Sequence, residues 1–218
     1  MIAELGNYAL ALSLAVSFFL AILPLWGAEK GHTQLMSLAR PMTYGLFFTL
    51  TIAFAALFYL FAVNDFSVQY VVNNSNRSLP IYYRLSAVWG SHEGSLLLWI
   101  WLLTLWGAAV ALFSKHLPQE AVARVLGIMG IISIGFLLFV LFTSNPFTRT
   151  FPDFPVDGRE LNPMLQDVGL IFHPPLLYMG YVGFSVAFAF AIASLMTGKL
   201  DSAWARWSRP WTIAAWVF

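Results

Sequence analysis

The sequence predicts an all-α membrane protein, built as a polytopic transmembrane helix bundle. Of its 218 residues, 60% are hydrophobic and 17% aromatic, whereas only 10% are charged. Soluble domains carry about 25% charged residues. The hydrophobic residues also form runs of about 20, and at about 1.5 Å rise per residue a helix of that length crosses a hydrocarbon core about 30 Å thick. One membrane domain over residues 1–218 is therefore expected.

Five complete spans and the start of a sixth follow one another along the chain. The first apolar run is too long, and lacks the basic start, for a cleavable signal peptide. Pro41 is expected to open the second span and Pro174-Pro175 the fifth, because a first helical turn tolerates the missing N–H. The last run, WTIAAWVF, is too short to cross a membrane, which predicts the N-terminal part of a longer polytopic protein. The spans are roughly 5–26, 41–63, 93–113, 123–143 and 174–197, with a truncated one at 211–218.

Lysine and arginine in the loops predict the orientation of the chain. One set of alternate loops and their flanks holds seven basic residues, Lys30, Arg40, Lys115, Arg124, Lys199, Arg206 and Arg209. The other set holds four, Arg77, Arg84, Arg149 and Arg159. Cytoplasmic loops are enriched in these residues. The N-terminus and the long loops 64–92 and 144–173 are therefore expected outside, in the periplasm if the source is a bacterium. The Phe and Leu content of the second long loop favours an ordered segment packed on the membrane surface.

Composition also excludes several kinds of chemistry. The chain has no cysteine, so it forms no disulfide, thiolate metal site or iron–sulfur cluster of its own. A net charge of +1 argues against nucleic acid as a partner. The middle of every span lacks charged residues and histidine, and ion-coupled transporters usually place such residues inside the membrane. Chemistry is therefore expected at a membrane–water boundary.

The first candidate site is the stretch WGSHEGSLLLW, residues 89–99. Ser91 can act as a helix N-cap, and Glu93 suits the positive end of the helix dipole. Glycine on either side of His92-Glu93 allows tight backbone packing. This capping interpretation leaves the histidine unexplained, and the second histidine of a HExxH zinc site is absent. A structural role and a direct functional role for His92-Glu93 both remain open.

The second candidate is His173, in the stretch HPPLLYMGYVG. Proline disfavours the α conformation for the residue before it, so Pro174 is expected to hold His173 outside the helix, at the lip of the span. A rigidly held imidazole in an aromatic setting suits axial ligation of a haem iron. The alternative is an interfacial histidine with a backbone hydrogen bond.

Taken in order, WGSHEGSLLLW and LNPMLQDVGLIFHPPLLYMGYVG resemble the haem-handling CcmF family of bacterial cytochrome c maturation. The resemblance runs from Met1 along the whole chain and implies a multi-pass protein of the bacterial inner membrane. Members of this family receive haem from the chaperone CcmE on the periplasmic side. With CcmH and CcmI they promote its covalent attachment to the CxxCH motif of apocytochrome c.

The resemblance also implies roles for particular residues. His173 matches the first of two periplasmic histidines that ligate the delivered haem, while Trp89, His92 and Glu93 are possible contacts on the haem or substrate surface. No catalytic residue is assigned. The second histidine, the tryptophan-rich segment and the ligands of a b-type haem belong downstream of Phe218.

The function predicted is thus that of a cytochrome c haem lyase component. Two other classes stay open, a haem or small-molecule membrane transporter and a non-catalytic assembly scaffold. A relative dedicated to assembly of a nitrite-reductase cytochrome shares the same motifs.

Overall fold

The structure is a computed structural model that describes residues 1–152, 154–198 and 202–218. Lys199, counted above among the basic loop residues, and position 153 of the second long loop lie outside the described residues. In the described part of the chain, the strand-like pairing is a single antiparallel bridge between Val68 and Arg149. The remaining regular structure is helical, so the predicted all-α fold is confirmed.

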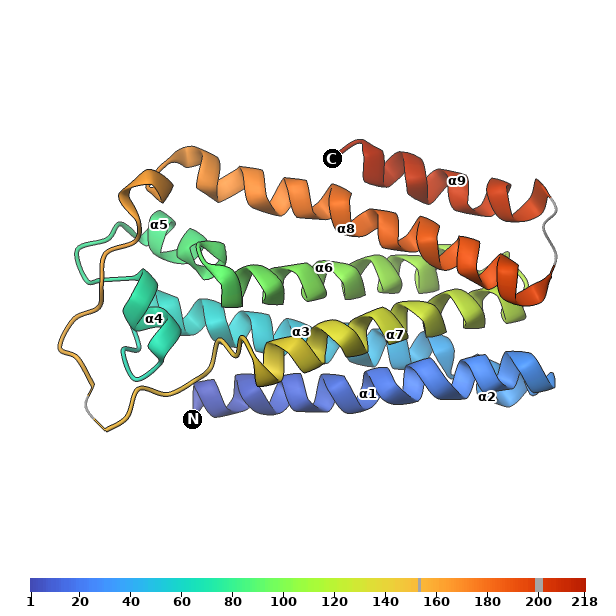
Figure 1. Ribbon diagram of the computed structural model, residues 1–218, viewed down its shortest axis with the longest axis horizontal. Coiled ribbons are helices and arrows are strands. Elements are labelled where there is room, and N and C mark those ends of the chain that lie inside the picture. The colour runs from blue at the N-terminus through green and yellow to red at the C-terminus, as the bar shows by residue number, and fades with distance from the viewer. Residues whose placement is uncertain (153, 199–201) are drawn as a thin grey trace.

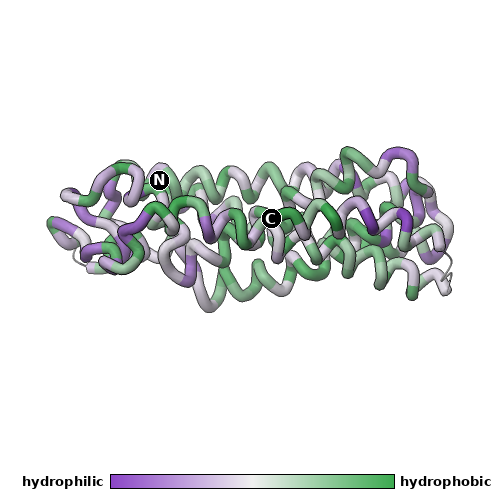
Figure 2. Tube along the Cα trace, turned by 90° about the horizontal axis from the view of Figure 1, so that it is seen from above, coloured by the Kyte–Doolittle hydropathy of each residue, from purple (hydrophilic) through white to green (hydrophobic). Residues whose placement is uncertain are grey.

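Five helices of the described chain are long and apolar enough to cross a membrane. They are α1 (Ile2–Lys30), α3 (Ala39–Ala62, preceded by the short α2, Thr33–Ser37), α6 (His92–Phe113), α7 (Gln119–Phe142) and α8 (Val168–Thr197). These helices run alternately in opposite directions (Figure 1). One end of the bundle, here the loop end, carries residues 63–91 and 143–167; the opposite turn end carries residues 31–38 and 114–118. Hydrophilic positions gather toward both ends and hydrophobic positions fill the middle (Figure 2).

The long helices begin earlier than the predicted spans, and the difference is largest for α8 and α9. Helix α8 starts at Val168, six residues before Pro174, because the Asp167 side chain caps it by accepting a hydrogen bond from the Gly169 N–H at 2.7 Å. The expectation that Pro174 holds His173 outside the helix is therefore wrong. Similarly, α9 (Ser202–Trp216) begins well before position 211 and contains Pro210.

A tryptophan from another helix explains how α8 continues through the proline. Pro174 has no N–H to donate to the Leu170 carbonyl, which lies four residues earlier. Trp89 Nε1–H instead donates to that oxygen at 2.8 Å. The Leu170 carbonyl, which the proline leaves without its backbone donor, is therefore hydrogen-bonded.

The long helices pack as one layered bundle. Helix α1 contacts α3 and α7, α3 contacts α6, and α6 contacts both α7 and α8, along which α9 lies. Small residues allow the close approaches, as in membrane bundles generally. A Cβ on Gly130 of α7 would lie 3.1 Å from the backbone nitrogen of Ala21 in α1. A buried hydrogen bond between the hydroxyls of Ser13 and Thr49, 2.7 Å long, joins α1 to α3.

A buried arginine ties two helices together at the turn end. Arg124 lies in the second turn of α7 and its side chain is only 5% exposed. Its guanidinium pairs with Glu120 at 3.0 Å and with Glu29 at 3.7 Å, and it donates to the Ala28 carbonyl. The end of α1 is thus held against the start of α7.

At the loop end, the two long loops are ordered against each other. They contain α4 (Gln69–Asn74), α5 (Ile81–Ser86), and the 3-10 turns η1 (Ala87–Trp89) and η2 (Pro163–Leu165). The Gln69 N–H donates to the Thr148 carbonyl at 2.9 Å, and the Thr150 N–H donates to the Ser67 carbonyl at 3.0 Å. Phe147 and Leu161 of the second long loop are buried, whereas Phe151 and Phe154 are exposed. Packing of this loop on the membrane surface stays a prediction.

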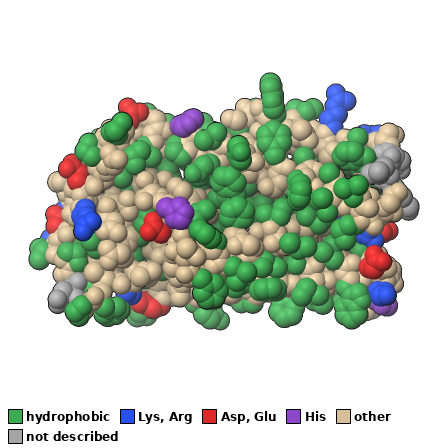
Figure 3. Space-filling view, viewed as in Figure 1, with side chains coloured by type: hydrophobic (Ala, Val, Ile, Leu, Met, Phe, Trp, Pro, Cys, Tyr) green, Lys and Arg blue, Asp and Glu red, His purple; other side chains and the backbone are tan. Residues whose placement is uncertain are grey.

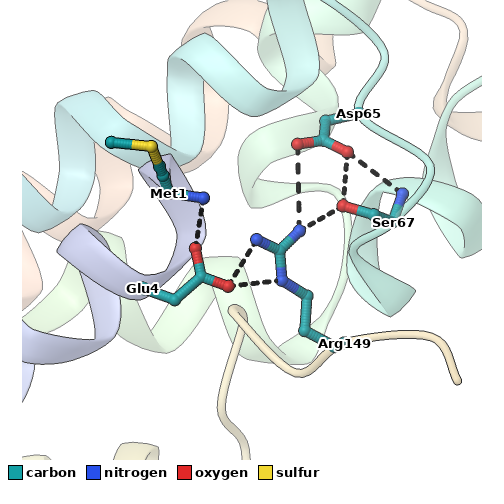
Figure 4. Close-up of polar contacts among 5 residues, drawn as sticks. All are labelled: Met1, Glu4, Asp65, Ser67 and Arg149. Atoms are coloured by element: carbon teal, nitrogen blue, oxygen red, sulfur yellow. Dashed lines mark hydrogen bonds and ion pairs between the residues drawn. The ribbon is translucent and has the colours of Figure 1, made fainter.

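A charged cluster fastens both loops to the first helix (Figure 4). The Arg149 guanidinium donates to the Glu4 carboxylate through Nε at 2.8 Å and Nη2 at 2.5 Å. It also donates to the Ser67 hydroxyl and lies 3.9 Å from the Asp65 carboxylate. The N-terminal amine of Met1 completes the cluster by pairing with Glu4 at 2.5 Å.

Candidate functional site

The turn before α6 is held by a buried tyrosine. Ser91 occupies the N-cap position of α6, as predicted, but its side chain makes no capping hydrogen bond. Tyr70 of α4 supplies the missing contacts, because its hydroxyl donates to the Val88 carbonyl at 3.0 Å and accepts from the Ser91 N–H at 3.3 Å. Burial and then the nearby Glu93 carboxylate raise the pKa of Tyr70 well above its usual range. The phenol therefore keeps the proton that it donates.

Gly94 is required by the close approach of this turn. A Cβ at position 94 would lie 1.6 Å from the Val88 carbonyl oxygen and 2.6 Å from the Tyr70 hydroxyl. No side chain fits at these distances. The interpretation of this glycine as a tight-packing residue is confirmed. His92 and Glu93 lie just before it, in the first turn of α6.

His92 is exposed at the start of α6 and is oriented by the end of α7. Its Nδ1 lies 3.0 Å from the hydroxyl of buried Ser144, and its ring meets Phe139 edge-on at 5.9 Å. Within the described chain Nε2 has no hydrogen-bond partner. A histidine fixed through one ring nitrogen presents the other to a ligand. Ser144 lies 52 residues from His92, and no sequence spacing pointed to this pairing.

His173 is an exposed residue of α8, and its imidazole makes no hydrogen bond within the described chain. Side chains four and eight positions later share its face of the helix. These are Leu177 and Tyr181, which are 46% and 67% exposed, and Phe172 beside the histidine is also exposed. The imidazole thus stands above an exposed apolar strip, a surface that suits a flat apolar ring with a metal at its centre.

Aromatic residues that follow the two histidines on α6 and α8 form one cluster. Trp99 lies about two turns after His92 on the same helix. Its ring is 5.3 Å from Tyr178 and 5.7 Å from Tyr181 of α8, and it stacks on Phe136 of α7 at 5.7 Å. Figure 3 shows exposed histidine side chains toward the loop end of this face, beside a broad band of hydrophobic side chains. The helices that carry the two predicted histidines, α6 and α8, therefore meet each other and α7 in this cluster.

Trp89 and Glu93 are less available than the histidines. Trp89 is half-buried, its indole N–H is bonded to Leu170, and its ring packs edge-on against Phe58 at 5.8 Å. Glu93 is half-buried beside Tyr70. Among the described residues, no group of three or more His, Asp or Glu side chains could hold a metal ion.

Replacing Trp89 with phenylalanine is expected to lower the free energy of unfolding by about 1–3 kcal/mol, because the Leu170 carbonyl would lose its donor. Thermal unfolding of the purified parent protein in detergent measures this loss. Trp26→Phe is the matched control, since Trp26 is 54% exposed and makes no indole hydrogen bond in the described chain. Equal melting temperatures for the two variants would contradict the role given to the Trp89 bond.

The fold and the surface together define a class, a multi-pass membrane protein with exposed histidines at one end of its helix bundle. Residues 89–218 match the family described as Cytochrome C assembly protein. Because the match covers more than half of the chain, the chain belongs to that family.

Particular relatives make the assignment finer. The chain is 90% identical over 218 residues to the cytochrome c-type biogenesis protein CcmF of Haemophilus influenzae, and 59% identical to that of Escherichia coli. A solved structure of the cytochrome c heme lyase CcmF matches 99% of the chain with a TM-score of 0.83 and 30% identity. The chain spans 34% of the length of each of these proteins. The predicted resemblance to CcmF is confirmed.

Proposed function

We propose that the chain is the N-terminal part of a cytochrome c haem lyase, and that its loop end handles haem on the periplasmic side of a bacterial inner membrane. The names of the relatives support the role in cytochrome c biogenesis. The carrying observation is the exposed imidazole of His173, which has no hydrogen-bond partner in the described chain and lies beside the apolar strip of Leu177 and Tyr181. Haem is a substrate here, delivered by CcmE and passed to apocytochrome c with CcmH and CcmI.

Each residue of the surface has a distinct part in this proposal. His173 supplies an axial ligand to the delivered haem, and the apolar strip below it receives the ring face. His92, oriented by Ser144, lines the same surface through Nε2. Trp89 sets the position of the α8 segment that carries His173. The second periplasmic ligand and the ligands of a b-type haem are assigned to the downstream part of the parent protein.

The chain's own contribution to catalysis is orientation. Holding two reactants in the right geometry converts a bimolecular step into an effectively unimolecular one, which is worth about 7–11 kcal/mol of barrier at best. The haem supplies the reactive vinyl carbons, and the protein holds them toward the cysteine thiols of the apocytochrome. Arg149 ties both long loops to α1 beside the place of this encounter.

A complementation experiment tests the proposal. A bacterium that lacks its own CcmF is expected to regain covalently haem-stained c-type cytochromes when it produces the full-length parent of this chain. An empty vector is the control. Failure to restore haem attachment, with the parent protein present in the membrane, would contradict the proposal. Movement of haem into sealed vesicles by the parent protein alone would favour a transporter instead.

A further inference from the structure

A cleft lies at the turn end, far along the bundle from His92 and His173. It opens between the α6–α7 turn and α9 and has a volume of about 590 Å³. Its lining comes from the end of α6, the following turn and one face of α9. The residues are Phe113, Ser114, His116, Leu117, Arg206, Trp207, Pro210, Trp211 and Ala214.

The lining separates into an apolar floor and a basic rim. Trp207 and Trp211 share one face of α9 and, with Phe113 (66% exposed), form the apolar part. Arg206 and His116 are exposed at the rim. None of the described residues that line the cleft is acidic. The cleft therefore matches a ligand with an anionic group attached to an apolar chain.

The walls of the cleft are held in place by contacts outside it. The Arg40 guanidinium of α3 donates to the Ser114 carbonyl at 3.0 Å, and this bond fixes the α6–α7 turn. On the other side, Trp106 of α6 meets Trp211 edge-on at 6.4 Å. The second half of α9 lies directly on α8, because a Cβ on Gly183 would be 2.8 Å from the Ala215 Cβ. These contacts set the positions of both walls of the cleft.

We propose that this cleft binds an anionic phospholipid, with the phosphate at Arg206 and His116 and an acyl chain along Trp207 and Trp211. The cleft lies beside the C-terminal end of α6, a helix long and apolar enough to cross a membrane. Basic pockets between helices near the ends of such spans bind anionic headgroups. A free phosphate would leave the aromatic floor uncovered. The proposal makes no use of haem binding at the loop end.

Native mass spectrometry of the full-length parent protein tests the lipid site. The protein in detergent is mixed with phosphatidylglycerol or phosphatidylcholine, and retained lipid is counted. Preference for phosphatidylglycerol is expected, and Arg206→Gln is expected to reduce its retention about fivefold, the value of one cation near a lipid headgroup. Arg209→Gln is the matched control, because Arg209 is an exposed residue of the same helix that does not line the cleft.

Further arms distinguish a bound lipid from a bound free phosphate. Phe113→Ala is expected to weaken retention of both lipids, and inorganic phosphate is expected to displace neither. No retained lipid, equal retention of the two lipids, or equal losses in the two arginine variants would overturn the proposal. Displacement by inorganic phosphate would overturn it in favour of a phosphate site. The haem spectrum of Arg206→Gln is expected to be unchanged, so failure of the haem proposal would be seen separately.

Discussion

Replacing His173 with alanine in the full-length parent protein is expected to reduce haem capture and cytochrome c yield at least about tenfold. Losing even an outer partner of a metal ligand costs about 10–100-fold in metal affinity, and this change removes the proposed ligand itself. The fold should survive, because the His173 side chain is exposed and makes no hydrogen bond in the described chain. Haem absorbance of the purified protein and haem-stained cytochromes measure the two effects.

His32→Ala is the matched control for that experiment. His32 is also an exposed histidine, but it lies at the turn end, just before α2. Its substitution should leave both haem readouts at the wild-type level. A folded His173→Ala protein with normal cytochrome c yield would remove the ligand assignment and favour a scaffold role.

Replacing Gly94 with alanine is expected to destabilise the parent protein by about 3 kcal/mol, near the upper end for overpacking a core. The new Cβ would lie 1.6 Å from the Val88 carbonyl oxygen, and a backbone oxygen cannot rotate away as a side chain can. Relief requires the start of α6 to separate from η1, which also moves His92. A lower melting temperature in detergent and a weaker haem signal are expected together.

Gly135→Ala provides the comparison within another span. Gly135 lies inside α7, and among the described residues no neighbouring atom lies within 4 Å of the position that a Cβ would take there. Alanine at this position should leave stability unchanged or raise it by about 0.5–1 kcal/mol, because glycine is unfavourable inside a helix. If both glycine variants melted at the wild-type temperature, the close approach at Gly94 would not be the constraint described.

The sequence predicted the features that depend on local pattern. Long apolar runs were sufficient to find the five long helices, since length and composition alone decide whether a helix can cross a membrane. Glycine beside His92 correctly indicated a close approach. The early start of α8 also had a local signal, because Asp167 precedes an apolar run as helix caps do. Pro174 outweighed that signal in the prediction.

Features that depend on long-range contacts were beyond sequence reasoning. The bond that lets α8 pass through Pro174 joins Trp89 to a residue 81 positions away. Ser144 orients His92 across 52 positions. The sequence analysis used Arg149 only as one of the basic loop residues that predict the orientation of the chain. In the structure it fastens α1 to both loops. The periodicity of hydrophobic residues along the chain does not predict such pairings, because each depends on how the helices pack against one another.

The paired prolines give α8 a joint just above the apolar strip. Neither Pro174 nor Pro175 can donate a backbone hydrogen bond to the turn before it, so residues 168–173 are attached less firmly than the rest of the helix. Trp89, at the end of the first long loop, holds that short segment through Leu170. The direction of the His173 imidazole therefore depends on the position of the first long loop. The Trp89 bond thus couples the position of the proposed haem ligand to the first long loop.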